Sequence, residues 1–221
     1  RLKASGIHLG LSLVIALAAA LLVFGIWYPY PYREISGGRE LFLLVVTVDV
    51  ILGPLITLAV FNRAKPWTEL RRDLVIVVLI QLAALAYGLW TVSIARPVHM
   101  VFEIDRFRVV HGVDIPDELL PQTPPGIQAL PLAGPTLLAV RPFRDGNERM
   151  NATMSALQGV ALSARPDLWQ PYADAVPRIL QVAQPVSTLK TRYSDSAAEI
   201  DRIVTAAGRK PETALYLPLT G

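Results

Sequence analysis

Three long apolar stretches dominate the first 96 residues of the chain. Residues 7–28 and residues 74–95 contain no charged side chain, and residues 41–61 contain only Asp49. Each stretch is longer than 20 residues, and at about 1.5 Å of rise per residue such a helix crosses the roughly 30 Å hydrocarbon core of a bilayer. We therefore predict three transmembrane helices within residues 1–96, which excludes a soluble cytosolic enzyme.

The first stretch contains the small residues typical of a signal-peptide cleavage site, at positions 16–20. Its apolar run continues past them to Trp27 and Tyr28, so we expect a membrane anchor that is retained. Short loops rich in Lys and Arg stay in the cytoplasm. Six Lys and Arg residues precede the first stretch or follow the second, against only Arg33 and Arg39 between the two. This predicts a cytoplasmic N-terminus and an outer location for the chain after the third stretch.

Residues 97–221 have the mixed pattern of one small folded domain. The β-branched and aromatic residues of positions 98–110 predict one or two strands, and the prolines and glycines of positions 116–135 predict a long loop. Periodicity and capping residues predict the remaining elements, which are a strand at 136–140, helices at 148–162, 171–182 and 194–208, and a last strand at 214–217. The predicted fold class is a membrane protein with three transmembrane α-helices, followed by a small α+β extracytoplasmic domain.

The composition agrees with a membrane protein and excludes several kinds of site and partner. Hydrophobic residues make up 52% of the chain and charged residues 18%, compared with about 45–50% and about 25% in an average soluble domain. The chain has no cysteine, which excludes a disulfide scaffold, a thiolate metal site and a thiol nucleophile. The net charge of +3 is spread without a dense basic run, so we expect no nucleic-acid partner.

The histidines show no catalytic or metal-binding pattern. His99 and His111 lie near acidic residues, but their spacing matches no metal-binding motif. Alternation places His99, Val101, Glu103 and Asp105 on one face of the first predicted strand, which we expect to lean toward solvent. The chain also lacks a phosphate-binding glycine loop and a nucleophile elbow. We therefore expect no metal, no cofactor and no enzymatic activity.

Among the predicted spans, the second carries the most informative polar residue. Asp49, Gly53 and Thr57 are spaced i, i+4 and i+8 and share one helix face. Pro54 lacks the N–H of a regular helix and so loosens the helix beside them. A charged side chain at mid-span costs about 2.5–3.5 kcal/mol, so Asp49 must face protein or water. Three roles are open for it: a hydrogen bond within the bundle, a contact with a partner's helix or a polar ligand, and a proton relay.

Small and polar residues form stripes on the other two predicted spans. The stripes are Gly6 and Gly10, followed by Ser12 and Ala16, on the first span, and Gln81, Ala84, Gly88 and Thr91 on the third. Small residues let helix backbones approach closely, so the stripes serve either packing within this bundle or docking of another protein's helix. In the first case Gln81 or Tyr87 is also the expected partner of Asp49.

Six segments, in a fixed order, carry a resemblance to a known family. They are GIHLGLSL at 6–13, WYP at 27–29, SGGRELF at 36–42, VDVILGPLITLAVFN at 48–62, QLAALAYGLW at 81–90 and ARPVHMVFEIDRFRVV at 95–110. Together they resemble the TfpX/TfpZ family of type IV pilin accessory proteins, also called FimB-like. The most specific part is the combination of the DVILGP motif in the second span with the RPVHMVFEIDRF motif after the third.

This resemblance implies a chaperone-like protein of the bacterial inner membrane, with a periplasmic C-terminal domain (97–221) and no catalytic chemistry. Its expected partners are the type IV major pilin, other inner-membrane pilus assembly proteins and the lipid bilayer. We hypothesise that the spans hold the pilin's apolar helix and that the strands after the third span approach the pilin head. The candidate residues are Asp49, Gly53, Pro54, Thr57, Gln81 and Gly88 in the spans, and Phe102, Glu103, Asp105 and Arg106 in the domain. The alternative is a non-catalytic subunit or regulator bound to the pilus motor platform, which modulates assembly and retraction.

Overall fold

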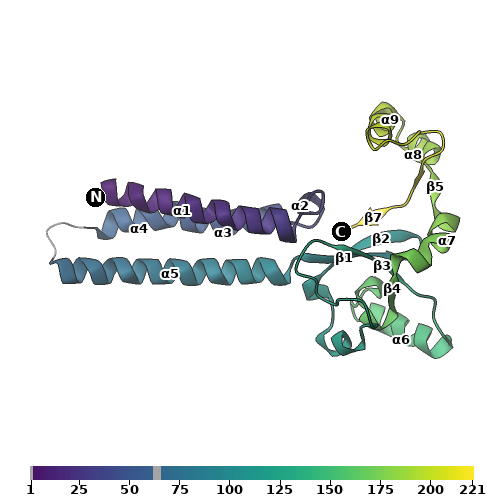
Figure 1. Ribbon diagram of the computed structural model, residues 1–221, viewed down its shortest axis with the longest axis horizontal. Helices are drawn as coiled ribbons and strands as arrows, with labels where there is room; N and C mark the ends of the chain where they lie inside the picture. The colour runs from purple at the N-terminus through teal and green to yellow at the C-terminus, as the bar shows by residue number, and fades with distance from the viewer. Residues whose placement is uncertain (1, 62–65) are drawn as a thin grey trace. The chain divides into compact units, whose positions relative to one another are not determined.

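The computed structural model describes residues 2–61 and 66–221, except for the side chains of Leu41, Leu44, Val45, Val48 and Asp49. The chain forms two compact units (Figure 1). The first contains the helices of the N-terminal part up to Val98, together with residues 111–113 and 130–135. The second contains residues 99–110, 114–129 and 136–221. Each unit is described by itself.

The first unit consists of three helical runs that lie side by side (Figure 1). The first and second runs each include a π-helical turn, and a single-turn helix stands between them. The elements are α1 (Leu2–Leu22), the π-helical turn η1 (Val23–Trp27), α2 (Tyr32–Ile35), α3 (Gly38–Thr47), the π-helical turn η2 (Val48–Leu52), α4 (Gly53–Val60) and α5 (Trp67–Ile94). Both α1 and α5 pack against the α3–α4 run.

Two of these runs are long and apolar enough to cross a membrane, Leu2–Trp27 with 26 residues and Trp67–Ile94 with 28. They correspond to the first and third predicted spans. The second predicted span is helical but divided, and its apolar helix Val50–Val60 is shorter than a span. The division falls at η2, immediately before Gly53 and Pro54, where proline cannot supply the N–H that a regular helix needs.

One end of the first unit is packed around a buried aromatic ring. Tyr28 is fully buried among Ala19, Val23, Phe42 and Val92. Its hydroxyl donates a hydrogen bond to the carbonyl oxygen of Ala95 at 2.7 Å. The ring thereby connects the end of the first run to the end of α5, and α3 begins beside it.

The second unit is built on a five-stranded mixed sheet with the order β4-β3-β1-β2-β7. Strands β1 and β3 are parallel, β2 and β7 are parallel, and β3 and β4 are antiparallel. Strands β5 and β6 form a separate antiparallel pair. The bounds are β1 (Pro97–Glu103), β2 (Arg106–His111), β3 (Thr136–Val140), β4 (Trp169–Pro171), β5 (Gln184–Pro185), β6 (Leu215–Tyr216) and β7 (Leu219–Thr220).

Helices and short 3-10 turns fill the connections of this sheet. The helices are α6 (Gly146–Leu157), α7 (Tyr172–Val182), α8 (Val186–Arg192) and α9 (Ala197–Ala206). The 3-10 turns are η3 (Gly112–Asp114), η4 (Asp117–Gln122), η5 (Leu162–Ala164), η6 (Pro166–Leu168) and η7 (Ser194–Ser196). Helix α7 covers the sheet, because Ala175 and Ile179 pack on Phe102 and Ala139. Helices α8 and α9 pack on each other.

The predicted elements of this unit are largely present, with three corrections. The helix predicted at 148–162 ends at Leu157, because Gly159 follows with a left-handed φ of +94°. Its apolar residues Met150 and Leu157 are exposed. Helix α8 and the short strands β4, β5 and β7 had no clear signal in the sequence. The most consequential correction is that β1 is buried on both faces. His99, Val101 and Glu103 of the face predicted to lean toward solvent are therefore interior, and only Asp105, in the turn after the strand, is exposed.

Candidate functional site

A polar stripe on α1 contacts the face of α4 that the sequence singled out. Ser5 and His8 lie one turn apart, and both reach α4. The hydroxyl of Ser5 donates to the carbonyl oxygen of Pro54 at 2.9 Å. Nδ1 of His8 is hydrogen-bonded to Oγ1 of Thr57 at 2.5 Å. The part of the predicted polar face from Gly53 to Thr57 is therefore covered by this chain's own first helix.

Gly53 lets the side chain of Gln81 cross over α4. A Cβ at position 53 would lie 1.8 Å from Nε2 of Gln81 and 3.3 Å from Nε2 of His8. No side chain larger than hydrogen fits there while Gln81 keeps its position. The glycine thus brings polar groups of α1 and α5 together over the backbone of α4.

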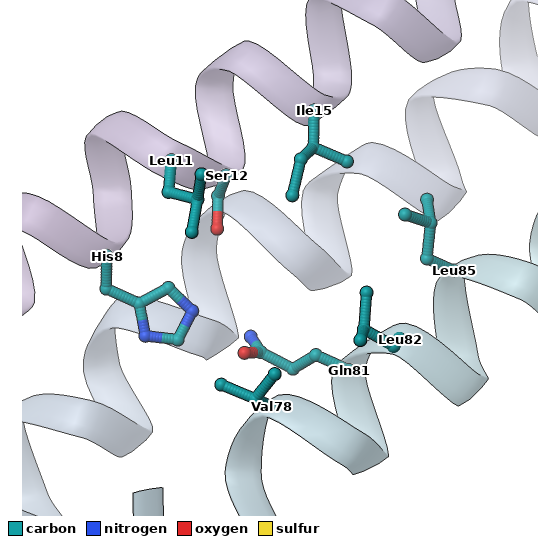
Figure 2. Close-up of a pocket in the computed structure, with 8 residues that line it drawn as sticks. All are labelled: His8, Leu11, Ser12, Ile15, Val78, Gln81, Leu82 and Leu85. Carbon is teal, nitrogen blue, oxygen red and sulfur yellow. The ribbon is translucent and has the colours of Figure 1, made fainter. Parts of the chain in front are cut away.

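These polar groups line a small pocket between α1 and α5 (Figure 2). Its volume is about 210 Å³. The lining residues are His8, Leu11, Ser12, Ile15, Val78, Gln81, Leu82 and Leu85. Figure 2 shows the imidazole of His8, the amide of Gln81 and the hydroxyl of Ser12 converging on its interior. Ser12 is only 8% exposed. Neither Ser12 nor Gln81 has a side-chain hydrogen bond to any residue of the described part of the chain.

The structure brings together four of the six candidate residues of the spans, namely Gly53, Pro54, Thr57 and Gln81. Gly88 is buried about two turns further along α5. Asp49 belongs to η2, but its side chain lies outside the described residues, so its predicted hydrogen bond, partner contact and proton relay stay predictions.

Sequence reasoning noted Ser12 among the small residues of the first span, but it missed the contribution of Ser5 and His8 to this site. The signal was present, because Ser5, His8 and Ser12 follow the spacing i, i+3 and i+7 in an otherwise apolar segment. Of the stripe that was noticed, Gly6 and Gly10 are exposed, and a Cβ on either glycine would meet nothing within 4 Å, whereas Ser12 is buried. Docking of another helix on that face stays a prediction.

The candidate residues of the second unit divide into two buried and two exposed. Phe102 is fully buried, with the guanidinium of Arg178 5.3 Å from its ring centre. The carboxylate of Glu103 accepts a hydrogen bond from the backbone N–H of Ser163 at 2.9 Å, and it pairs with Arg108. Both therefore hold the interior together.

The turn between β1 and β2 is the exposed part of this candidate region. Asp105 and Arg106 form an ion pair at 2.9 Å, with about half of each side chain exposed. Ile104 precedes them with a φ of +52° and is 74% exposed. The residues of this turn that face solvent are available to a partner.

His99 is a buried, neutral residue of the sheet. Its Nε2 lies 2.9 Å from the carbonyl oxygen of Ala129. Because a carbonyl only accepts, Nε2 carries the hydrogen, and Nδ1 accepts from the hydroxyl of Thr136 at 2.7 Å. Burial lowers the pKa of His99 to about 4, and the hydrogen bond to the Ala129 carbonyl acts in the opposite direction. The ring edge packs against Trp169, so His99 has a structural role.

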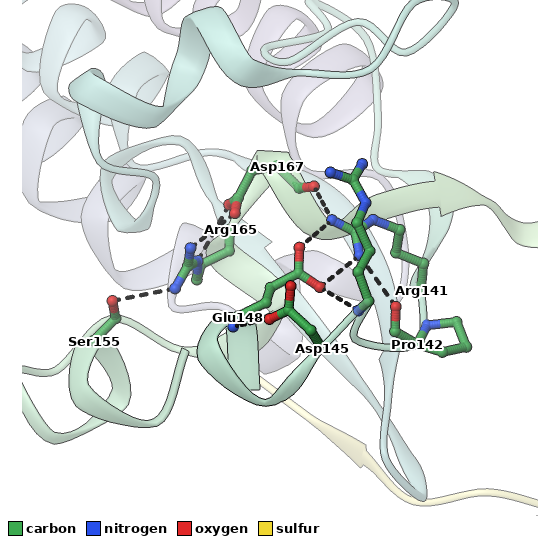
Figure 3. A network of polar contacts seen from close by, with 8 residues as sticks. Arg141, Pro142, Asp145, Glu148, Ser155, Arg165 and Asp167 are labelled. Carbon is green, nitrogen blue, oxygen red and sulfur yellow. Dashed lines mark hydrogen bonds and ion pairs between the residues drawn. The ribbon is translucent and has the colours of Figure 1, made fainter. Parts of the chain in front are cut away.

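A charged network fastens α6 to the sheet (Figure 3). Arg141, which follows β3, makes two hydrogen bonds to the carboxylate of Glu148, at 2.6 and 2.9 Å. The hydrogen bond from Arg141, followed by one from the backbone N–H of Arg144, lowers the pKa of Glu148 to about 2. Asp145 caps α6 by accepting from the N–H of Glu148 at 2.8 Å. These groups satisfy one another, which is typical of a structural network.

The site in the helical unit is suited to binding. It combines apolar walls with hydroxyl, amide and imidazole groups that converge on one pocket, two of which have no hydrogen-bond partner among the described residues. An arrangement of this kind fixes the orientation of a bound polar group.

Known proteins with similar sequences are fimbrial assembly proteins. The family described as fimbrial assembly protein FimB matches residues 1–37. The chain is 37% identical over 218 residues to the fimbrial assembly protein of serogroup E1 of Dichelobacter nodosus, covering 98% of this chain and 85% of that protein. The serogroup I protein of the same organism is 38% identical over 219 residues, with the same coverage.

A shorter relative, the fimbrial assembly protein of serogroups C1 and C2, is 43% identical over 120 residues, which are 54% of this chain and 92% of that protein. No solved structure matches the chain. The similarity over nearly the whole length confirms the resemblance seen in the sequence and supports a role in pilus biogenesis. The chain belongs to the FimB family of fimbrial assembly proteins.

Proposed function

We propose that this protein is an inner-membrane accessory protein that binds a type IV pilin and assists its stability and its assembly into pili. In this proposal the chain crosses the membrane three times, with the N-terminus in the cytoplasm and residues 97–221 in the periplasm. The observation that carries the proposal is its similarity to fimbrial assembly proteins along a chain that joins membrane-length helices to a folded domain.

The divided second run is compatible with a third span. Helix α3, the π-helical turn η2 and helix α4 have ten, five and eight residues and follow one another without a break. At about 1.5 Å per residue the run is about 34 Å long, which matches the hydrocarbon core of a bilayer. The proline therefore loosens this run without shortening it.

The arrangement of the runs supports binding of another helix. Because α1 and α5 each pack on the α3–α4 run, a groove lined by α1 and α5 stays open above α4, and the pocket lies in it. Leu11 and Leu82 of this groove are 59% and 49% exposed. A fourth apolar helix would cover them.

The test is co-purification of tagged pilin with the full-length protein from solubilised membranes, together with pilin abundance in cells that lack the protein. We expect the pilin to co-purify, and its abundance to fall in the deletion strain and to recover on complementation. An unrelated inner-membrane protein with three spans serves as the control.

The opposite result also has a definite meaning. Unchanged pilin abundance, with a motor-platform protein co-purifying in place of the pilin, would contradict the proposal. That outcome would favour the alternative of a regulator bound to the pilus motor platform.

A further inference from the structure

The pocket between α1 and α5 contains polar groups that have no hydrogen-bond partner among the described residues. Ser12 is buried, its hydroxyl points into the pocket, and it makes no hydrogen bond within the described residues. The side-chain amide of Gln81 also makes no hydrogen bond within the described residues. His8 uses Nδ1 on Thr57, so its Nε2 faces the pocket beside Gln81. Such groups are costly in an apolar surrounding unless a partner satisfies them.

The pocket would lie within the hydrocarbon region in the proposed membrane position. Among the described residues, only apolar side chains complete its lining, from Leu11 and Ile15 of α1 to Leu82 and Leu85 of α5. Ser12 lies five residues after the start of the first apolar stretch (7–28), and Gln81 lies seven residues after the start of the third (74–95), which corresponds to about 8 Å and about 10 Å at 1.5 Å per residue. Lipid tails cannot satisfy the hydroxyl and amide groups at this depth, and the imidazole of His8 lies at the edge of the same region.

We propose that this pocket receives a side chain ending in a carboxyl or carboxamide group, carried by the apolar helix of the bound pilin. The inference rests on the proposed function, which supplies the helix. The hydroxyl of Ser12 and the amide N–H of Gln81 both donate, and a carbonyl or carboxylate oxygen accepts both hydrogen bonds. Nε2 of His8 pairs with the remaining donor or acceptor of the same group.

The size of the pocket fits one such side chain. Its volume is about 210 Å³, and a protein cavity of about 150 Å³ holds a benzene ring. The apolar walls accept the methylene groups of the side chain, while its polar end reaches Gln81 and Ser12. Gly53 contributes by leaving space for the Gln81 amide, since a Cβ there would lie 1.8 Å from it.

The test uses a photocrosslinking amino acid in the full-length protein, in cells that produce tagged pilin. Position 11 lies in the groove, and position 13 is its matched control, because Leu11 and Leu13 are similarly exposed, at 59% and 52%, on opposite sides of α1. We expect a pilin crosslink from position 11 and little from position 13.

Substitutions of the pocket then test its chemistry. Ser12→Ala and Gln81→Met remove the polar groups with little change of shape, and Ser93→Ala, on the same helix as Gln81 but outside the pocket, is the control. Each pocket variant should lower the crosslink yield about threefold at equal protein abundance, since one hydrogen bond between membrane helices contributes modestly. Ser93→Ala should leave the yield unchanged.

A reciprocal arm keeps this protein in its wild-type form, so that misfolding of a variant cannot mimic the result. Each Asp, Glu, Asn and Gln of the pilin's apolar helix is replaced by Leu in turn. One replacement should lower the crosslink yield as much as the pocket variants do. Combining it with Gln81→Met should lower the yield no further, because both substitutions remove the same contact. Whether that residue is acidic or an amide distinguishes the carboxyl from the carboxamide.

Three results would overturn the inference about the pocket without contradicting pilin binding by another surface of the protein. They are full crosslink yield in both pocket variants, a pilin crosslink from position 13 in place of position 11, and crosslinks from position 11 to lipid alone. Absence of any pilin crosslink and of co-purification would instead contradict the proposed function, and the inference with it.

Discussion

His99 couples the stability of the second unit to pH. In the folded protein burial keeps its pKa at about 4, below its ordinary value of 6.5. The unfolded chain therefore binds a proton first as the pH falls, and stability is lost between about pH 6.5 and pH 4. Between pH 7 and pH 5 this residue alone accounts for a loss of about 2 kcal/mol in the free energy of unfolding.

Urea unfolding of the full-length protein in detergent, followed at pH 7 and pH 5, measures this loss. The variant His99→Gln has no titrating group and should show a smaller difference between the two pH values. Glu148 contributes little between pH 7 and pH 5, because the stabilisation from its lowered pKa is lost only as the pH falls through its ordinary value of 4.5 toward about 2. An equal pH dependence in both proteins would mean that other groups cause it.

Gly38 is a position of the first unit at which a side chain would meet a fixed aromatic ring. A Cβ there would lie 2.2 Å from Cδ1 of Tyr28, and this ring is fully buried and held through its hydroxyl. We expect Gly38→Ala to destabilise the unit by about 1–3 kcal/mol, as overpacking does elsewhere. The matched control is Gly25→Ala, because a Cβ at Gly25 meets nothing within 4 Å. Thermal unfolding measures the difference. An equal drop in the unfolding temperature of both variants would contradict this account.

At the scale of elements, Gly53 and Gln81 act as a pair across α4 and α5. Gly53→Ala forces the Gln81 side chain to move, because the new Cβ and Nε2 of Gln81 would overlap. The substitution should therefore cost stability in the wild type and little in the background of Gln81→Ala. A double-mutant cycle on thermal unfolding measures the coupling. Additive effects of the two substitutions would show that the contact is unimportant.

Local sequence signals predicted some elements closely and others poorly. The strand predicted at 136–140 coincides with β3, and the helix predicted at 171–182 matches α7 to within one residue, because both are framed by strong local signals. The alternating pattern of β1 led to the wrong prediction that one face of this strand leans toward solvent, because helix α7 and other segments bury both of its faces. A strand buried on both faces no longer needs alternating polarity.

At the scale of the whole molecule, the proposed topology predicts which positions are reachable from each side of the membrane. The chain contains no cysteine, so single cysteines can be introduced without a prior cysteine-free variant. A cysteine at Thr68, at the start of α5, should react with an impermeant maleimide only after the inner membrane is permeabilised. A cysteine at Ser194 should react from the periplasmic side in intact spheroplasts. Labelling of both positions from the same side would contradict three spans.

The sequence by itself determined the long apolar helices, the family and most elements of the second unit. These features depend on composition, on periodicity and on residue order within short windows, which are all local. It also marked Gly53, Thr57 and Gln81, because polar and small residues are conspicuous in an apolar segment.

Only the tertiary structure decided what those residues do. It placed Thr57 on His8 and Gln81 over Gly53, and it left Ser12 facing a pocket that no single helix shows. It also turned Phe102 and Glu103 from candidate surface residues into interior ones. The reason is physical: hydrogen bonds, burial and cavities depend on which helices and strands become neighbours, and residues far apart in the chain decide that together.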